Sequence, residues 1–361
     1  MIIESIELKN YRNYDKLHMD FSHGTNILYG DNAQGKTNIL ESVYLCGTTK
    51  SHRGSKDREM IRFGQEEAHI RMETVRKEIP CRVDMHLKKN RAKGIAVNGV
   101  PIHKASELIG LGNFVFFSPE DLNIIKNGPS ERRRFLDMEL CQLSRVYVHN
   151  LINYNRVLMQ RNRLLKDISF HPEYRDTLDI WDEQMASYGI SLIRSRDDFI
   201  RELNGIIFPI HGRLSGGREE LTLLYEKNVS EQDFREQLAG SREKDIRMRV
   251  THIGPHRDDI LFQIGGVDIR RYGSQGQQRT AALSLKLAEI DLVREKSKDT
   301  PVLLLDDVLS ELDANRQRYL LESISRIQTL LTGTGIEEFV ENRFPIHRLF
   351  YVEAGKVTRQ K

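Results

Sequence analysis

The segment GDNAQGKT, Gly30 to Thr37, constrains the fold more than any other part of this sequence. It fits the pattern G-x-x-x-x-G-K-[ST], in which the glycines let backbone N–H groups wrap phosphate oxygens while the lysine reaches the β- and γ-phosphates. The pattern requires a strand before it and a helix after it. The apolar run 25–30 indicates the strand, and apolar residues recur at helical spacing in 37–46. The sequence therefore predicts an α/β fold with a nucleotide phosphate loop at this position.

A magnesium ion is expected beside this loop. The Thr37 hydroxyl is the predicted protein ligand within the loop, and the helix that begins at Lys36 adds the positive end of its dipole. The predicted ATP-contacting residues of the segment are Gly30, Asp31, Asn32, Ala33, Gln34, Gly35, Lys36, Thr37 and Asn38.

The second metal ligand is expected at the end of a buried strand. The apolar run 302–305 is followed by Asp306, which we predict to hold Mg²⁺, and by Asp307, which we predict to orient or deprotonate the attacking water. The alternative is that this acidic segment only caps the next helix, since Ser310 and Asp313 have capping-box spacing. Catalysis and capping are compatible, so both interpretations stay open.

A third segment, SQGQQR at 274–279, opens a long amphipathic helix. Ser274 and Gln277 also fit a capping box, so the simplest interpretation is a well-capped helix. The same geometry presents free N–H groups and a hydroxyl to an anion. The predicted nucleotide contacts of this segment are Ser274, Gln275, Gly276 and Gln277.

Charge and composition limit the remaining possibilities. The chain has 55 Lys+Arg against 52 Asp+Glu, a net charge of +3, so any affinity for nucleic acid must come from a local patch. From residue 119 the pattern is mostly helical, and 121–166 carries nine basic and four acidic residues. Within it, Arg132, Arg133 and Arg134 are the DNA-contact candidates, although basic helix faces are often merely solvated.

Cysteine content and hydropathy favour a soluble protein of a reducing compartment. Cys46, Cys81 and Cys141 form no C-x-x-C pair, and no His/Cys ligand spacing occurs, which argues against a disulfide framework and against a structural zinc. No apolar stretch approaches the ~20 residues needed to cross a bilayer, and the beginning of the chain does not resemble an export signal. We therefore expect a cytoplasmic protein, with no membrane association.

The separation of the motifs indicates the class of phosphate-loop protein. Asp306 lies 270 positions after Lys36, and no N-K-x-D guanine-binding motif occurs. Long insertion between the two motifs is typical of ABC-type ATPases. We expect mixed sheets and an inserted helical lobe, with 1–118 and 265–361 forming the ATPase lobe and 119–264 the largely helical second lobe.

Seven segments together resemble the RecF family of bacterial recombination mediators, which is similar to the head domains of SMC proteins. In chain order these are LKNYRNY at 8–14, GDNAQGKTN at 30–38, FSPEDL at 117–122, PSERRRFLD at 129–137, GPHRDD at 254–259, GSQGQQRT at 273–280 and LLLDDVLSELD at 303–313. The resemblance covers essentially the whole chain in the expected order.

The resemblance implies a homodimer that forms when ATP binds, with the phosphate loop and Asp306 of one protomer facing Ser274 to Gln278 of the other. Arg12 matches a basic residue that lies beside the nucleotide in this superfamily. Asp307 stands where many ABC-type enzymes have glutamate, so slow, DNA-stimulated ATP hydrolysis is implied. Thr332 or Thr334 occupies the place of the usual switch histidine, and FSPEDL is the candidate region for the Q-loop.

The implied role is binding single-stranded and gapped duplex DNA and, with RecR-like and RecO-like partners, helping to load the RecA recombinase. That role places the protein at the nucleoid, in DNA repair, replication and the SOS response. Two alternatives stay open: an SMC-like structural head, which the lack of sustained heptads disfavours, and an ABC-type subunit that binds no DNA.

Overall fold

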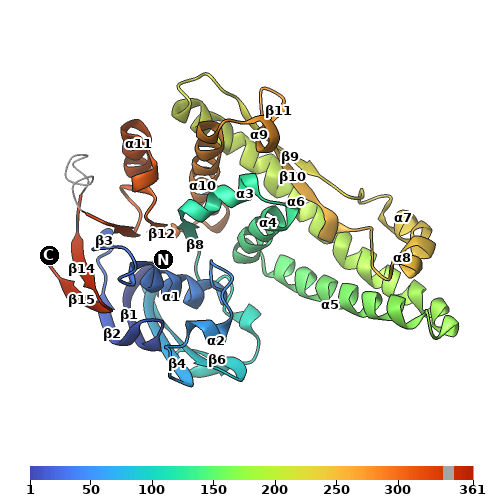
Figure 1. Cartoon of the computed structure of the whole chain (residues 1–361), viewed down its shortest axis with the longest axis horizontal. Coiled ribbons are helices and arrows are strands. Elements are labelled where there is room, and N and C mark those ends of the chain that lie inside the picture. The colour runs from blue at the N-terminus through green and yellow to red at the C-terminus, as the bar shows by residue number, and fades with distance from the viewer. Residues whose placement is uncertain (336–344, 361) are drawn as a thin grey trace. The chain divides into compact units, whose positions relative to one another are not determined.

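The computed structural model describes residues 1–335 and 345–360 in two compact units (Figure 1). The first unit combines Met1–Asp121 with Leu285–Lys361, and the second is Leu122–Ser284. Residues 336–344 and 361, which belong to the range predicted for the ATPase lobe, lie outside the described residues. Among the described helices none combines the length and the apolar character that crossing a membrane requires.

The division differs from the predicted one at its second boundary. The segment 265–284 is predicted for the ATPase lobe, whereas in the structure it belongs to the second unit. The reason is local pairing: β11 (Val267–Asp268) forms a hairpin with β10 (Asp259–Ile264), and α9 (Ile269–Tyr272) packs on β10 through the buried Ile269.

An antiparallel sheet forms one layer of the first unit. Its strands, in spatial order, are β2 (Tyr14–Asp20), β1 (Ile2–Tyr11), β4 (Glu67–Arg76), β5 (Ile79–Lys88), β6 (Arg91–Val97) and β7 (Val100–Ile102). Along β4, buried residues alternate with exposed or half-buried ones, the pattern of a sheet with one covered face. Strands β6 and β7 form a hairpin through Asn98 and Gly99, and both residues have the positive φ of a type I′ turn.

A mixed sheet forms the second layer and carries the sequence motifs. Its order is β15 (Lys356–Arg359), β14 (Arg348–Glu353), β3 (Thr25–Tyr29), β13 (Thr329–Gly333), β12 (Val302–Asp306) and β8 (Phe114–Phe117). All neighbours are parallel except β15, which runs antiparallel to β14.

Helix α1 (Lys36–Thr48) lies between these two sheets. It contacts β4 and β5 of the antiparallel sheet and β8, β12 and β13 of the mixed sheet. Because both sides are covered, nearly all its residues are buried, and its apolar residues do not form a single stripe. The other helical segments that the structure describes in this unit are α2 (Asp57–Met60), the second part of α10 (Gln275–Ser297), α11 (Ala314–Ile324) and short 3₁₀ turns at Ala105–Glu107, Pro119–Asp121 and Leu309–Glu311.

The second unit is mostly helical, as predicted. Its helices are α3 (Leu122–Lys126), α4 (Pro129–Leu143), α5 (Arg145–Asp167), α6 (Leu178–Leu214), α7 (Phe234–Gly240), α8 (Arg242–Met248), α9 (Ile269–Tyr272) and the first part of α10 (Gln275–Ser297). Two 3₁₀ turns lie at Pro172–Thr177 and Pro255–Arg257. Helices α5 and α6 pack along one another, and β9 (Leu221–Glu226) pairs with β10 beside α6. The segment LSGGREE at 214–220 ends α6 and turns into β9.

Candidate nucleotide site

Parallel pairing in the mixed sheet brings the first two motifs together. Strand β13 lies between β3 and β12, and Thr332 of β13 stands opposite Leu28 on one side and Asp306 on the other. The phosphate loop follows β3, and Asp306 ends β12. Since the carboxyl ends of parallel strands share one edge of a sheet, residues 270 positions apart become neighbours.

The loop from Gly30 to Gly35 has the conformation that a phosphate cradle requires. Gly30, Ala33 and Gly35 have φ values of 142°, 63° and 113°, and positive φ values of this kind allow a loop to present its backbone N–H groups to an anion. Any larger residue at Gly35 would be strained, because an added Cβ would lie 2.4 Å from the Asn13 Nδ2 atom. At Gly30 the Cβ would lie 2.3 Å from the Val352 carbonyl oxygen.

Two hairpin turns hold the loop from behind. From the β1–β2 turn, Asn13 Nδ2 donates to the Gln34 carbonyl at 2.9 Å, and the Tyr14 hydroxyl donates to the Gly35 carbonyl at 3.1 Å. From the β14–β15 turn, the Ala354 N–H donates to Gln34 Oε1 at 2.6 Å, and the Gly355 N–H donates to the Gln34 carbonyl at 3.3 Å. Gln34 therefore accepts hydrogen bonds from residues of both turns.

The Lys36 side chain lies over this cradle. Its Nζ atom donates to the Gly30 carbonyl at 2.5 Å and to the Asp31 carbonyl at 2.7 Å. Burial lowers the pKa of Lys36, and the carboxylates of Asp307, Asp306 and Asp31 oppose that effect. The ammonium is thus held at the mouth of the loop, while Asp31, Asn32 and Ala33 are exposed.

Thr37 and Asp306 meet directly. The Thr37 hydroxyl donates to Asp306 Oδ1 at 2.7 Å, and the Thr332 hydroxyl donates to the same oxygen at 2.8 Å. Burial raises the pKa of Asp306 despite these hydrogen bonds. A hydroxyl and a buried carboxylate side by side form an all-oxygen donor set, which suits Mg²⁺, and a bound cation would offset the burial and favour the carboxylate form. The residues therefore fit the ion predicted for them.

Asp307 has a strained backbone at the same edge. Its φ is 52°, in the left-handed region, and its N–H donates to the Thr332 hydroxyl at 2.9 Å. Thr332 therefore links the backbone of Asp307 to the carboxylate of Asp306. Of the two threonines considered for the γ-phosphate sensor, Thr332 is buried at this position and Thr334 is exposed beyond the strand end.

Arg12 is anchored next to the loop. Its guanidinium makes a two-pronged ion pair with Glu41 of α1, at 2.8 and 2.9 Å, and also donates to Ser55 Oγ at 2.8 Å and to the Glu59 carbonyl at 2.9 Å. Burial opposes ionisation of Glu41, but the hydrogen bonds from Arg12 and Ser51 outweigh it and lower its pKa. Arg12 is thus a positioned, partly exposed cation rather than a loose surface arginine.

One cation at this edge was missed in the sequence. Arg53 lies with Nη2 4.0 Å from Asp306 Oδ2, at the end of the loop that follows α1. Its segment SHRGS has no motif of its own, so only the fold reveals the proximity. Asn38, predicted to contact nucleotide, donates instead to Asn13 Oδ1 at 2.9 Å and so supports the loop from its side.

The SQGQQR segment begins α10 in the second unit. Ser274 and Gln277 cap the helix reciprocally: the Gln277 N–H donates to Ser274 Oγ at 3.2 Å, and the Ser274 N–H donates to Gln277 Oε1 at 2.9 Å. Ser274, Gln275 and Gly276 are exposed, whereas Gln278 is buried and donates to the Ile269 carbonyl. The capping interpretation is correct, and it leaves the helix N-terminus accessible.

The predicted DNA-contact triplet is wrong for Arg132. This side chain is 1% exposed and donates to both Asp259 oxygens at 2.5 and 3.0 Å, as well as to the Ile124 and Asn127 carbonyls. Arg133 is half-buried and donates to the Asp258 carbonyl. In this triplet Arg134 alone is exposed. A buried, fully paired guanidinium stabilises the unit and cannot reach a phosphate.

Comparisons with known proteins agree along the whole chain. The sequence profile of the RecF/RecN/SMC N terminal domain family matches residues 2–331. The DNA replication and repair protein RecF of Lachnoclostridium phytofermentans is 61% identical over 359 residues, covering 99% of this chain and 100% of the relative. The protein of the same name from Clostridium perfringens is 44% identical over 362 residues and covers 99% of both chains.

Solved structures show the same similarity. A structure of the recombination mediator protein RecF-ATPrS in the RecFOR pathway has a TM-score of 0.91 at 36% identity, covering 99% of this chain and 98% of that one. An SmcHead bound to the C-winged helix domain of ScpA shares the fold, with a TM-score of 0.60 at 16% identity over 100% and 98% of the two chains. The expected fold class, an ABC-type ATPase head with an inserted helical lobe, is confirmed.

Proposed function

This chain belongs to the RecF family, and from that premise we propose that it is an ATP-dependent, DNA-binding recombination mediator. The single observation that carries the proposal is the contact between Thr37 and Asp306 beside a preformed phosphate loop. It unites two motifs from distant parts of the sequence in the arrangement that nucleotide chemistry needs.

The loop residues bind the nucleotide in this proposal. Backbone N–H groups from Gly30 to Gly35 surround the phosphates, and Lys36 exchanges its two carbonyl acceptors for phosphate oxygens of higher charge. Arg12 and Arg53 add positive charge near the loop and near Asp306, respectively. These contacts bind ATP through its phosphates, and the solved relatives named for ATP and for an ATP analogue support that ligand.

Thr37 and Asp306 would hold Mg²⁺, which would neutralise charge on the nucleotide phosphates. Asp307 then orients the attacking water and accepts its proton. The side chain of Asp307 is one methylene shorter than that of glutamate and so holds the water less well. We therefore propose slow hydrolysis, which suits a protein that stays closed on its DNA for a limited time rather than one that moves along it.

Pairing of two protomers completes the mechanism. The exposed N-terminus of α10, with Ser274, Gln275 and Gly276, offers N–H groups to the nucleotide of a second copy. ATP then has a higher affinity for the dimer than for the monomer, so it shifts the population toward the dimer, and hydrolysis removes that shift.

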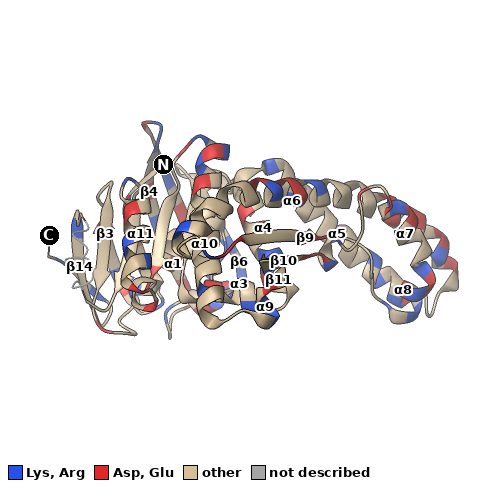
Figure 2. Ribbon diagram, turned by 90° about the horizontal axis from the view of Figure 1, so that it is seen from above, with Lys and Arg blue, Asp and Glu red and all other residues tan. Residues whose placement is uncertain are grey.

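DNA contacts are proposed for the exposed cations of the second unit. Arg134 stays a candidate, and further exposed basic residues are Lys126, Arg145, Arg156, Arg163 and Lys166. On α7 and α8, basic and acidic residues are interspersed, so these helices carry no uniform positive face (Figure 2). Contacts to backbone phosphates give binding that weakens steeply with salt and has little base preference.

The partners proposed on the basis of the family are RecR-like and RecO-like mediators in the cytoplasm, with RecA loading at gapped DNA as the outcome. The test is the fluorescence anisotropy of a labelled gapped duplex, titrated under ATP–Mg²⁺ and under ADP. We expect tight, salt-sensitive binding only with ATP, and loss of it in both Lys36→Ala and Ser274→Arg.

A matched control separates loss of a cap from loss of the interface. Ser144 caps α5 by accepting from the Tyr147 N–H, so Ser144→Arg also removes a helix cap, worth about 1 kcal/mol, but lies outside the proposed interface. Its DNA binding under ATP is expected to be at least as tight as that of wild type, because the added arginine adjoins Arg145, a proposed DNA contact. Equal binding under ATP and ADP, or equal loss in both serine variants, would refute the nucleotide-closed clamp.

A further inference from the structure

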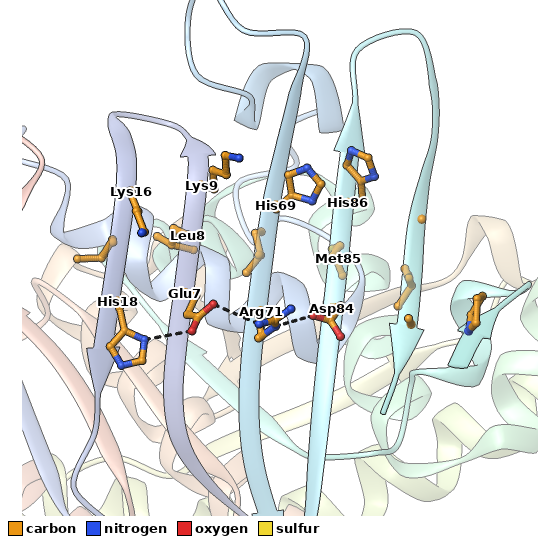
Figure 3. Close-up of a pocket in the computed structure, with 16 residues that line it drawn as sticks. Glu7, Leu8, Lys9, Lys16, His18, His69, Arg71, Asp84, Met85 and His86 are labelled. Carbon is orange, nitrogen blue, oxygen red and sulfur yellow. Dashed lines mark hydrogen bonds and ion pairs between the residues drawn. The ribbon is translucent and has the colours of Figure 1, made fainter. Parts of the chain in front are cut away.

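Three potential metal ligands meet on the outer face of the antiparallel sheet, a region that the proposed nucleotide chemistry does not use. His69 of β4 and His86 of β5 stand directly opposite one another, and Figure 3 shows their rings side by side on neighbouring strands. Glu67 lies two residues before His69 on the same strand and therefore on the same face. One ligand atom from each of the three lies within 4.8 Å of the others.

The contacts show that both rings turn the same nitrogen toward one point. His86 Nε2 lies 2.8 Å from Glu67 Oε2, and His69 Nε2 lies 3.7 Å from Glu67 Oε1. The rings are stacked with centroids 3.9 Å apart and an angle of 23° between their planes. Tetrahedral ligation with bonds of about 2.0–2.1 Å places ligand atoms about 3.3 Å apart. The rings therefore need to open from their stack into a V, a rotation that partly exposed side chains can make.

Access also favours a metal. The residue opposite His86 on the next strand is Gly94, which has no side chain. Together with His69 and His86, Gly94 lines a shallow hollow of about 780 Å³, which leaves room for a further ligand.

Nearby charges act in both directions. Lys9 is opposite His69 on β1, and Lys88 is opposite Glu67 on β5, and each ammonium disfavours a cation. The Glu67 carboxylate offsets one of these charges. Asp84, in the next row across the sheet, is paired with Arg71 and Arg82 and does not compete for the ion. The resulting affinity is that of a reversible site rather than of a permanent structural one.

We propose that Glu67, His69 and His86 bind a divalent transition-metal ion of the zinc class, through two imidazole nitrogens and one carboxylate oxygen. Imidazole with carboxylate is a ligand set for Zn²⁺ and similar ions, whereas Mg²⁺ prefers oxygen ligands alone. Three protein ligands leave a fourth position, toward the hollow, for water or a group from another molecule. The ion would tie β4 to β5 within the unit that carries the phosphate loop.

The test is a competition titration of the full chain with Zn²⁺ against a chromophoric chelator, in excess Mg²⁺ to occupy oxygen-only sites. Loss of even an outer partner of a metal site costs about 10- to 100-fold in affinity. We therefore expect His69→Gln, His86→Gln and Glu67→Gln each to lower the affinity of one zinc equivalent by about 100-fold or more. Co²⁺ bound at this site should show ligand-field absorption without a thiolate charge-transfer band.

His18→Gln is the matched control. His18 is an exposed histidine on the same face, 3.4 Å from Glu7 and 3.2 Å from Asp20, but among the described residues no second ring stacks on it. The zinc affinity of His18→Gln should equal that of wild type. Zn²⁺ should also raise the melting temperature of wild type and of His18→Gln but not of His86→Gln, which folds without the ion. Zinc binding unchanged in the three ligand variants, or a thiolate band with Co²⁺, would overturn the proposal.

Discussion

Replacing Arg132 by leucine tests whether this residue stabilises the fold or contacts DNA. The side chain is almost fully buried and its guanidinium donates four hydrogen bonds, two to Asp259 and two to backbone carbonyls. Leucine retains much of the apolar contact and removes all four. The Asp259 carboxylate, whose side chain is 20% exposed, then loses its ion-pair partner.

The expected loss of stability follows from that geometry. Breaking a buried ion pair by removing one partner costs about 3–5 kcal/mol, and the residual exposure of Asp259 places this case near 3 kcal/mol. For a unit of this size, about 2–4 °C per kcal/mol gives a fall in melting temperature of about 6–12 °C. Arg132→Leu combined with Asp259→Leu should recover part of this, since no unpaired carboxylate remains.

The test measures the melting temperature by thermal unfolding and the DNA affinity by anisotropy of a labelled gapped duplex, on the same protein preparations. Arg134→Leu is the control, because an exposed cation should change stability by less than about 1 kcal/mol. Arg132→Leu should melt early and, below its transition, bind DNA like wild type. A wild-type melting temperature together with weakened DNA binding would show that Arg132 reaches a phosphate and that the structural role is wrong.

Two further predictions concern pH and the phosphate loop. Burial lowers the pKa of His256 from 6.5 to about 4, and the Tyr154 hydroxyl donates a hydrogen bond to its ring. Below pH 6.5 the unfolded chain therefore binds a proton at His256 that the folded chain does not bind. Its contribution to stability is therefore full above pH 6.5 and is lost as the pH falls toward 4. Urea unfolding should show a slope of up to about 1.4 kcal/mol per pH unit there, and a slope unchanged in His256→Gln would contradict this. Gly35→Ala, whose Cβ would meet Asn13, should lower affinity for a fluorescent ATP analogue about tenfold or more without unfolding the chain; equal affinity would remove this loop from the nucleotide site.

The phosphate loop could be predicted because its signals are local. Glycines, lysine and threonine at fixed spacing, an apolar run before and a helical pattern after all fall within residues 25–46. Asp306 was predictable for the same reason, as an acid at the end of an apolar strand. Thr332 and Arg53 lie beside Asp306 only because of the strand order of the mixed sheet and the course of the loop after α1. No short sequence segment predicts these two contacts.

For Arg132, the sequence contains a sign of burial that a count of charged residues does not detect. It lies four residues before Leu136, which is four before Leu140, so all three fall on one face of α4. The helical repeat of the leucines therefore assigned Arg132 to the buried side. A run of three arginines suggests a surface patch, but only two of them can avoid that face.

The histidine pair lay beyond sequence reasoning for a different reason. Its register is set by the turn at Lys77–Glu78, where both residues have positive φ, at 49° and 66°. Turns of this kind usually contain Asn or Gly, and these two residues give no turn signal. Spacing rules for metal ligands also fail here, since His69 and His86 are brought together by pairing of two strands and not by a short motif.

The hydrogen bonds that hold Gln34 from two turns have a consequence for the order in which the phosphate loop is completed during translation. The residues that hold the loop from one side, Asn13 and Tyr14, are translated before it, whereas Ala354 follows Gln34 by 320 positions. At about 5–20 residues per second, the ribosome adds Ala354 about 16 to 64 s after Gln34. Between those two times the nascent chain carries a phosphate loop with only part of its support, and the β14–β15 turn then supplies the rest.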